Sequence, residues 1–185
     1  IYHWIAFLSS RPDPRVPVAN RYFGLFKNGT WKVRGNEVRR DDTSKWIKKI
    51  QREMLDLLAD APDAGQLRDQ LPRIHALLQA RLAALRQRKI PLEELLISQK
   101  ISRSLEEYKV PSPAARAAAQ LAAIDKNLIP GQRVRFLYTR GKPGVFAWDL
   151  EERPDPKSID IDRYAELLCR AAYTILQPLG MEERT

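Results

Sequence analysis

Residues 101–118 read ISRSLEEYKVPSPAARAA and are the most informative stretch of the chain. It starts with a β-branched and basic segment and continues to the pair Tyr108-Lys109 and a Pro-x-Pro break. Proline lacks the N–H that regular structure needs and restricts the residue before it, so the break separates two elements. The alanine-rich run that follows Pro113 predicts a closely packed helix that ends near Lys126.

Downstream of the break, two apolar runs and a long amphipathic segment follow one another. The runs 132–141 and 145–150 predict a β-hairpin with the glycines Gly141 and Gly144 at its tip. Asp160 or Asp162 is expected to start a last helix. The apolar stripe of that helix consists of Tyr164, Leu167, Leu168, Ala171, Ala172, Ile175 and Leu176.

Upstream, the dipeptide Asn28-Gly29 lies between two β-rich runs and predicts another hairpin, because both residues tolerate a positive φ. A two-stranded hairpin is rarely stable alone, so a further strand is expected before it. Residues 11–20 carry three prolines and predict an extended connector.

Two helices are predicted between this hairpin and the break. Asp42 or Thr43 is expected to cap the first helix, and the second covers about residues 66–89 with Pro72 in its first turn. The expected fold class is therefore α+β, mainly helical, with two β-hairpins.

The positive charge of the chain is distributed unevenly. Residues 1–150 contain 27 Lys and Arg against 15 Asp and Glu, whereas residues 151–185 contain 5 against 8. A basic body with an acidic C-terminal segment is typical of a surface that binds a polyanion such as DNA or RNA. An ordinary basic domain without nucleic acid has the same overall charge, so the charge is compatible with both interpretations.

Signatures of a self-contained enzyme are absent from the sequence. The glycines form no phosphate-binding loop, and neither His3 nor His75 has a neighbour at metal-ligand spacing. His75 is expected to be partly exposed. Cys169 is the single cysteine, so a disulfide is excluded, and it is expected to be a small core residue in a protein of the reducing cytoplasm. No apolar run approaches the ~20 residues of a membrane span, so no membrane partner is expected.

Four segments resemble, in the same order, the C-terminal part of family B DNA polymerases of the archaeal type. The first has a basic-Tyr motif before a Gly-x-Glu and Arg-Arg-Asp run, and the second has the Tyr-Lys run that opens the duplex-gripping thumb. The third has a Pro-Gly-x-x-Val strand, and the fourth has the final helix. These segments are residues 16–42, 88–113, 128–144 and 159–180.

The resemblance implies which residues contact DNA. Residues 18–20 read Val-Ala-Asn where the family has lysines, so the contact of this segment with the minor groove departs from the family pattern. Cations, hydroxyls and aromatic residues at the matching positions are expected to hold the duplex by its phosphates, without reading its sequence. The predicted contact residues are Arg21, Tyr22, Arg34, Arg39, Arg40, Lys100, Ser102, Arg103, Tyr108 and Lys109.

The resemblance also implies a division of labour within a larger polymerase. Residues 1–40 are expected to be the end of the palm and residues 41–185 the thumb, with primer–template duplex DNA and the rest of the polymerase polypeptide as partners. The Asp-containing strand and the Asp-Thr-Asp hairpin that hold two metal ions in the family are absent from this sequence. The chain by itself is therefore predicted to be inactive and to hold no cofactor, with Mg²⁺ expected in the parent enzyme.

Two alternatives remain open at this point. The chain is compatible with a separate or degenerate subunit that binds duplex DNA without polymerising. It is also compatible with a helical module whose basic surface binds an acidic protein. Salt separates these possibilities, because phosphate contacts weaken with salt more than apolar protein contacts do.

Overall fold

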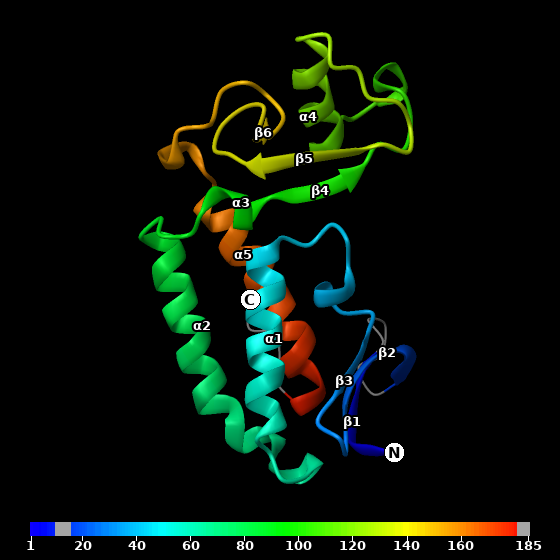
Figure 1. The fold of residues 1–185 in the computed structure, drawn as a ribbon, viewed down its shortest axis with the longest axis vertical. Helices are drawn as coiled ribbons and strands as arrows, with labels where there is room; N and C mark the ends of the chain where they lie inside the picture. The colour runs from blue at the N-terminus through cyan, green and yellow to red at the C-terminus, as the bar shows by residue number, and fades with distance from the viewer. Residues whose placement is uncertain (10–15, 181–185) are drawn as a thin grey trace. The chain divides into compact units, whose positions relative to one another are not determined.

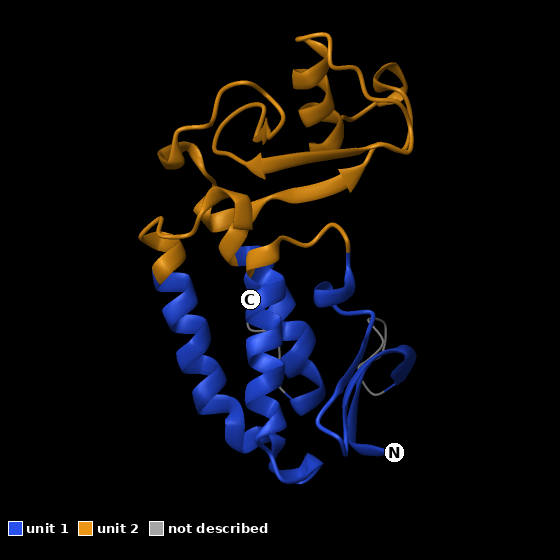
Figure 2. Ribbon diagram, in the orientation of Figure 1, with its two compact units in different colours: residues 1–40, 47–83, 166–185 blue, residues 41–46, 84–165 orange. Residues whose placement is uncertain are grey.

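The structure is a computed structural model that describes residues 1–9 and 16–180. Its described residues form five α-helices and two three-stranded antiparallel sheets (Figure 1), a mixture of the kind that was predicted. The chain divides into two compact units, shown in blue and orange in Figure 2. Unit 1 contains residues 1–40, 47–83 and 166–185, and unit 2 contains residues 41–46 and 84–165. The palm and thumb identities of residues 1–40 and 41–185 stay predictions.

Unit 1 contains a sheet of order β1-β2-β3. Its strands are β1 (Tyr2–Ser9), β2 (Pro17–Phe26) and β3 (Trp31–Arg34). The predicted hairpin at Asn28-Gly29 is confirmed, because β2 pairs with β3 and Gly29 has a positive φ of 81°. Strand β1 is the further strand that this hairpin was expected to need.

The connector predicted for residues 11–20 is wrong at its C-terminal end. Strand β2 starts at Pro17, a position at which the missing N–H of proline is tolerated. Residues 10–15, which include the rest of the predicted connector, lie outside the described residues.

Three helices provide much of unit 1, namely α1 (Lys45–Ala59), α2 (Leu71–Arg86) and α5 (Ile161–Leu176). Helix α1 starts at Lys45, so its start lies slightly later than a cap at Asp42 or Thr43 predicts. Its core stripe is confirmed by the burial of Ile47, Ile50, Met54 and Leu58. An ion pair of 2.7 Å joins Arg81 on α2 to Glu53 on α1.

The helix predicted over residues 66–89 is divided in two. A 3₁₀-helix, η2 (Ala64–Gln70), precedes α2, and the N–H of Leu71 donates to the carbonyl of Arg68. Pro72 has no N–H to give that carbonyl an α-helical hydrogen bond, so the α-helix cannot extend toward the N-terminus in unbroken form. Pro72 lies in the first turn of α2, as predicted.

Unit 2 contains the second sheet, of order β4-β5-β6. Its strands are β4 (Ile97–Lys100), β5 (Arg133–Tyr138) and β6 (Val145–Ala147). The predicted hairpin is confirmed as β5 and β6, with positive φ at Gly141 and Gly144. Strand β4 was not predicted. It pairs antiparallel with β5 and converts the hairpin into a three-stranded sheet.

Helix α4 (Pro113–Ala122) follows the Pro-x-Pro break, as predicted. The Ser112 hydroxyl accepts the N–H of Ala115 at 3.1 Å and caps the helix. Gln120 holds α4 to β6, because its amide donates to the carbonyl of Val145 and accepts the N–H of Ala147, both at 2.8 Å. The close packing expected of the alanines is confirmed by the burial of Ala114, Ala115, Ala117 and Ala118.

The chain adopts a left-handed backbone conformation at Asp125, just after the end of α4. Asp125 has a φ of 61°, and its N–H and that of Lys126 donate to the carbonyls of Ala122 and Leu121 at 3.1 and 3.0 Å. This is the left-handed capping position at which glycine is preferred. The substitution Asp125→Gly is expected to raise the free energy of unfolding by about 0.5–1 kcal/mol, measured by urea denaturation. The matched variant Asp125→Ala is expected to be less stable than Asp125→Gly. Equal stability of the two variants would show that the backbone conformation is not the cause.

Helix α5 starts as predicted, with the Asp160 side chain accepting the N–H of Arg163 at 3.0 Å. Its core stripe includes Tyr164, Leu168 and Ile175, each at most 1% exposed. The prediction that Cys169 is a core residue is wrong. Cys169 is exposed because it follows Leu168 by one position, which is about 100° around the helix from the buried stripe. His75 is exposed, in agreement with its prediction.

Shorter elements complete the described chain: η1 (Glu37–Arg39), α3 (Leu92–Leu95), η3 (Leu105–Glu107), η4 (Pro156–Ser158) and η5 (Gln177–Leu179). No helix among the described residues has the length and apolar character needed to cross a bilayer.

Candidate nucleic-acid interface

The ten predicted contact residues divide equally between the two units. The sheet set lies in unit 1 and consists of Arg21, Tyr22, Arg34, Arg39 and Arg40. The loop set lies in unit 2 and consists of Lys100, Ser102, Arg103, Tyr108 and Lys109.

Tyr22 and Arg34 of the sheet set share one face of the first sheet. Tyr22 is the register partner of both Arg34 on β3 and Phe7 on β1, so the three residues form one row across the strands. The rings of Phe7 and Tyr22 are 5.6 Å apart, and Phe7 is 43% exposed. The opposite face carries Phe23 and Leu25, which are buried. The sheet therefore has one core face and one face with exposed aromatic and basic side chains.

Arg21 does not share this face with Tyr22, because successive residues of a strand point to opposite sides. Its stem lies against Gly35, where an added Cβ would be 2.7 Å from the Arg21 Cγ. The adjacent pair Arg21-Tyr22 therefore does not act as one contact surface on the sheet.

Sequence reasoning missed Lys32, which extends the row of Tyr22 and Arg34. Lys32 is exposed, and its register partner on β2 is Gly24. Gly24 lies two residues after Tyr22 and therefore on the same face of the sheet. Gly24 has no side chain, and the Tyr2 ring occupies the space above it, since an added Cβ would be 3.0 Å from that ring. Tyr2 also stacks on Phe26 with ring centres 4.4 Å apart. The alternation of Lys32 and Arg34 in the sequence was the signal available for this face.

Arg39 and Arg40 lie at the end of η1 and are both exposed. The carbonyls of Asn36 and Glu37 accept their N–H groups at 3.1 and 3.0 Å. Val38, between Glu37 and Arg39, is buried. The turn therefore anchors an apolar residue in the interior and leaves the arginines at the surface.

The loop set forms around a closed turn between β4 and α4. The Tyr108 hydroxyl accepts the N–H of Ser102 at 3.2 Å, and the two hydroxyl oxygens are 3.1 Å apart. Inside this closure, the Glu107 carboxylate accepts the N–H of Ser104 at 3.0 Å. Ser102 and Tyr108, two of the residues predicted to contact DNA, are thus joined by hydrogen bonds across six positions of the chain.

Arg103 lies over the Tyr108 ring, with its Cζ 5.6 Å from the ring centre. The hydrogen bond from the Ser102 side chain is the main cause that lowers the pKa of Tyr108 below its usual 10.0, and the Arg103 charge adds to it. Neither Arg103 nor Lys109 forms an ion pair with a carboxylate in the described part of the chain. Their charge is available to an external anion.

Lys100 is brought together with arginines that were not predicted. It is the register partner of Arg133, and Ser98 is the partner of Arg135, so all four residues lie on one face of the second sheet. Arg133 donates to the Ser98 hydroxyl at 2.9 Å and to its carbonyl at 2.7 Å, which fixes its guanidinium. The Asp149 carboxylate pairs with Arg135. The signal for this face was the alternation in Arg133-Val134-Arg135.

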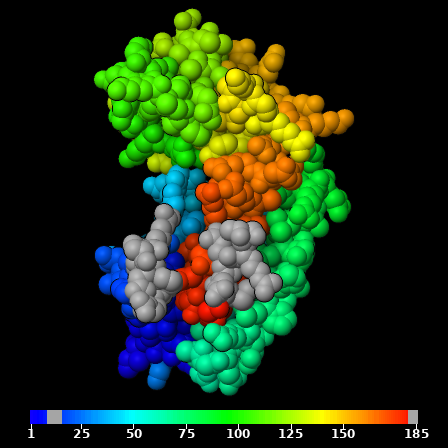
Figure 3. Space-filling model, turned by 180° about the vertical axis from the view of Figure 1, so that it is seen from behind, coloured from blue at the N-terminus to red at the C-terminus, as the bar shows by residue number. Residues whose placement is uncertain are grey.

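The surface of unit 2 also places α4 beside the hairpin of β5 and β6. In the space-filling view, the green residues around α4 adjoin the yellow residues of that hairpin (Figure 3), and α4 contacts both strands. The hairpin tip carries Arg140 and Lys142, both exposed.

Helix α1 carries a further basic stripe. Lys45, Lys49 and Arg52 are exposed and follow each other at helical spacing, and no Asp or Glu lies between them in the sequence. The described surfaces therefore carry exposed cations on several separate elements. Among residues 1–9 and 16–180, no three His, Cys, Asp or Glu side chains converge to form a metal site.

Comparison with known proteins relates this arrangement to a family. Residues 19–179 match the family model described as DNA polymerase family B. DNA polymerase 1 of Saccharolobus solfataricus is 25% identical over 161 residues, which cover 86% of this chain and 18% of that protein. The DNA polymerase of Archaeoglobus fulgidus is 29% identical over 148 residues, which cover 76% of this chain and 18% of that protein.

A solved structure has the same fold. The family B DNA polymerase of the hyperthermophilic archaeon Pyrobaculum calidifontis superposes with a TM-score of 0.68 at 24% identity. The match covers 88% of this chain and 21% of that polymerase. This chain therefore spans about a fifth of the length of the polymerases that it resembles.

Proposed function

Because this chain belongs to DNA polymerase family B, we propose that it is the C-terminal part of such a polymerase and holds primer–template duplex DNA without reading its sequence. In this proposal, residues 1–40 are the end of the palm and residues 41–185 are the thumb. The chain keeps the newly made duplex bound between nucleotide additions. Its partners are the duplex and the rest of the polymerase polypeptide.

The loop set is the observation that carries this proposal. The Ser102–Tyr108 closure holds the loop in one conformation, and Arg103 lies against the Tyr108 ring. A cation whose backbone is already ordered loses less conformational freedom when it binds a phosphate. Arg103, Lys109 and Lys100 are consequently proposed to contact the DNA backbone.

The sheet set supplies a second group of contacts in this proposal. Tyr22 and Arg34 occupy one exposed face, and Arg39 and Arg40 lie at the end of η1. Contacts of this kind with phosphate and sugar fix the position of a protein on the duplex but carry no sequence information. This is the behaviour that a polymerase needs in a region that follows the duplex.

Nucleotide transfer is proposed to take place elsewhere in the parent protein. The carboxylates that hold two metal ions in phosphoryl transfer are not present as a motif in this sequence. The described side chains offer no cluster of three His, Cys, Asp or Glu residues that could hold a metal ion. A cytoplasmic location is part of the proposal, on the basis of the single cysteine.

The proposal predicts weak binding to duplex DNA with a strong dependence on salt. If about 4 phosphates are neutralised, the slope of log K against log salt is expected to be near −3.6, from about −0.9 per phosphate. This slope is measured by fluorescence anisotropy with labelled duplexes of unrelated sequence, at salt concentrations between about 50 and 300 mM. The duplexes are expected to bind equally.

Two outcomes would contradict the proposal. A strong preference for one duplex would indicate readout of bases rather than of the backbone. Binding that does not change with salt would show that phosphate contacts do not provide the affinity, and it would favour an apolar protein partner.

A further inference from the structure

The Gln51 side chain forms an unusually complete set of hydrogen bonds inside unit 1. It is 0% exposed on α1, and its Oε1 accepts the N–H of Val38 at 2.7 Å. Its Nε2 donates to the Glu37 Oε2 at 2.7 Å and to the carbonyl of Ala171 at 2.8 Å. A backbone N–H only donates and a backbone carbonyl only accepts, so these partners define the orientation of the amide.

Glu37 is held from a second helix as well. The Thr174 hydroxyl on α5 lies 3.0 Å from the Glu37 Oε1 and 3.1 Å from the carbonyl of Arg170. Both carboxylate oxygens of Glu37 therefore have partners, one from α1 and one from α5. A charged group in a partly buried position is costly unless it is hydrogen-bonded, so these bonds keep Glu37 in one place.

These bonds also determine the position of Arg39. Helix η1 has only three residues, and Gln51 binds the first through its carboxylate and the second through its backbone N–H. The N–H of Arg39 is held by the carbonyl of Asn36 at 3.1 Å. The Arg39 side chain itself is exposed and forms no ion pair within the described residues. The backbone from which this side chain projects is thus held by contacts in the interior.

We infer that Gln51 is a positioning residue for Arg39, which it holds where the guanidinium meets a DNA phosphate. This inference rests on the proposed function, since it names a residue that acts through a cation of the same interface. Without the amide, η1 loses its attachment to α1, and Arg39 must be ordered when DNA binds. The phosphate contact is then lost or weakened although the arginine is still present.

The test uses Gln51→Met, because methionine has a similar length and favours helix but offers no amide. The slope of log K against log salt is expected to become shallower by about 0.9, the loss of one phosphate contact. Between about 50 and 200 mM salt this corresponds to a change of about 3.5-fold in the relative affinity of variant and wild type. Arg39→Ala is expected to give the same change, and the double variant Gln51→Met/Arg39→Ala is expected to give no further change.

The control is Met54→Ala. Met54 is also 0% exposed on α1, and it forms no hydrogen bond with Glu37 or Val38. It is expected to lower stability by leaving a cavity while keeping the wild-type salt slope. A purely structural role of Gln51 predicts instead that both variants lose stability and both keep the slope.

The results separate the inference from the proposed function. If the wild-type chain does not bind duplex DNA with a salt-dependent affinity, the proposed function and the role of Gln51 both fail. If wild type binds but Gln51→Met keeps its slope, or if Arg39→Ala adds its full effect in the Gln51→Met background, only the inference fails.

A second variant covers the case in which Gln51→Met does not fold. Thr174→Val removes one hydrogen bond from Glu37 and leaves Gln51 in place. It is expected to speed amide hydrogen exchange at Arg39 and to reduce the slope by less than Arg39→Ala does. Unchanged exchange and an unchanged slope would overturn the inference.

Discussion

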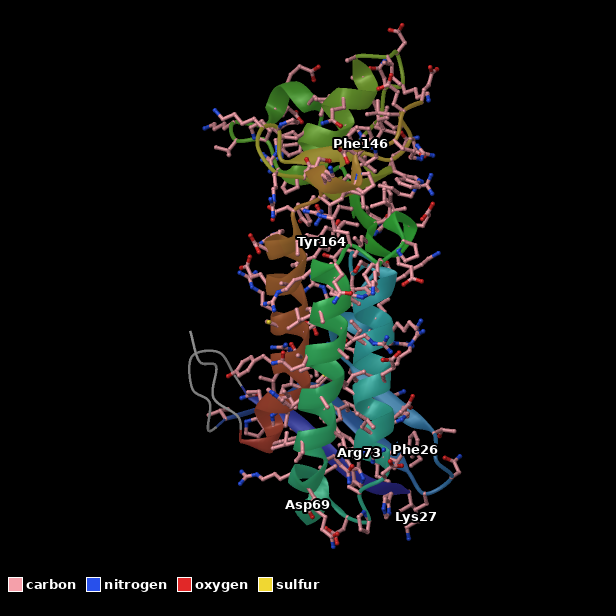
Figure 4. The ribbon with its side chains drawn as sticks, turned by 90° about the vertical axis from the view of Figure 1, so that its left-hand side faces the viewer. Phe26, Lys27, Asp69, Arg73, Phe146 and Tyr164 are labelled. Carbon is pink, nitrogen blue, oxygen red and sulfur yellow. The ribbon has the colours of Figure 1, made fainter. Side chains whose placement is uncertain are left out.

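Replacement of Tyr164 by alanine is expected to lower the free energy of unfolding by about 3–5 kcal/mol. Tyr164, labelled in Figure 4, is 0% exposed on α5, and its ring lies 5.9 Å from that of Tyr138. Its hydroxyl accepts the N–H of Tyr138 at 3.1 Å. Alanine removes the ring and leaves both a cavity and an unsatisfied N–H. Urea denaturation followed by circular dichroism measures the loss.

The matched variant Tyr164→Phe separates the ring from the hydroxyl. It keeps the packing but leaves the Tyr138 N–H without its partner, which is expected to cost about 1–3 kcal/mol. Burial raises the pKa of Tyr164 above its usual 10.0. At a pH just above 10.0, the hydroxyl therefore stays neutral in the folded state and ionises in the unfolded state.

The sign of the pH effect follows from that raised pKa. The contribution of Tyr164 to stability is complete below pH 10.0 and decreases as the pH rises from there toward the folded pKa. Wild type is therefore expected to lose more stability above that pH than Tyr164→Phe does. An identical loss in both proteins would show that Tyr164 ionises as readily in the fold as in the unfolded chain.

The double substitution Arg103→Ala/Lys109→Ala is expected to make the salt slope of DNA binding shallower by about 1.8, through the loss of two phosphate contacts. Over a fourfold increase in salt, from about 50 to 200 mM, this difference amounts to about 12-fold in relative affinity. Both side chains are exposed, and Arg103 lies 5.6 Å from the centre of the Tyr108 ring. The free energy of unfolding is expected to change by no more than about 1 kcal/mol, because exposed cations contribute little to a fold.

The control removes the same charge from positions where a carboxylate already neutralises it. Arg73, labelled in Figure 4, pairs with Asp60 at 2.6 Å, and Arg170 pairs with Glu166. The variant Arg73→Ala/Arg170→Ala is expected to keep the wild-type salt slope. If it weakens binding as much as the loop variant does, the interface has been assigned to the wrong surface.

Local signals in the sequence were sufficient for much of the fold. The Asn28-Gly29 turn, the Ser112-Pro113 helix start and the stripe of α5 each depend on residues within a few positions of one another. Strand β4 was missed because its four residues have no alternation of their own. They become a strand by pairing with β5, and the partners Ile97 and Phe136 are far apart in the chain.

The candidate interface could be predicted only as a set of residue types. The family resemblance named Arg21, Tyr22 and Arg34 only as contact residues. The structure places Tyr22 and Arg34 in one row of the sheet, whereas the alternation of β2 directs Arg21 to the other face. Lys32 and Arg133 were missed because each joins the surface through a register partner on another strand. Whether the ten predicted residues bind DNA stays a prediction that the salt experiments test.

The sequence by itself determined the family, the basic character of the body, the turns and the amphipathic helices. These properties depend on residues that are close together in the sequence. Within such short stretches, the backbone responds directly to the positions of proline and glycine and to the apolar periodicity. Only the tertiary structure decided which side chains meet. Gln51 reaches Glu37 and Ala171 across 14 and 120 positions of the chain, and no local pattern marks such partners. The physical reason is that a buried amide must satisfy its hydrogen bonds with whatever groups packing brings beside it.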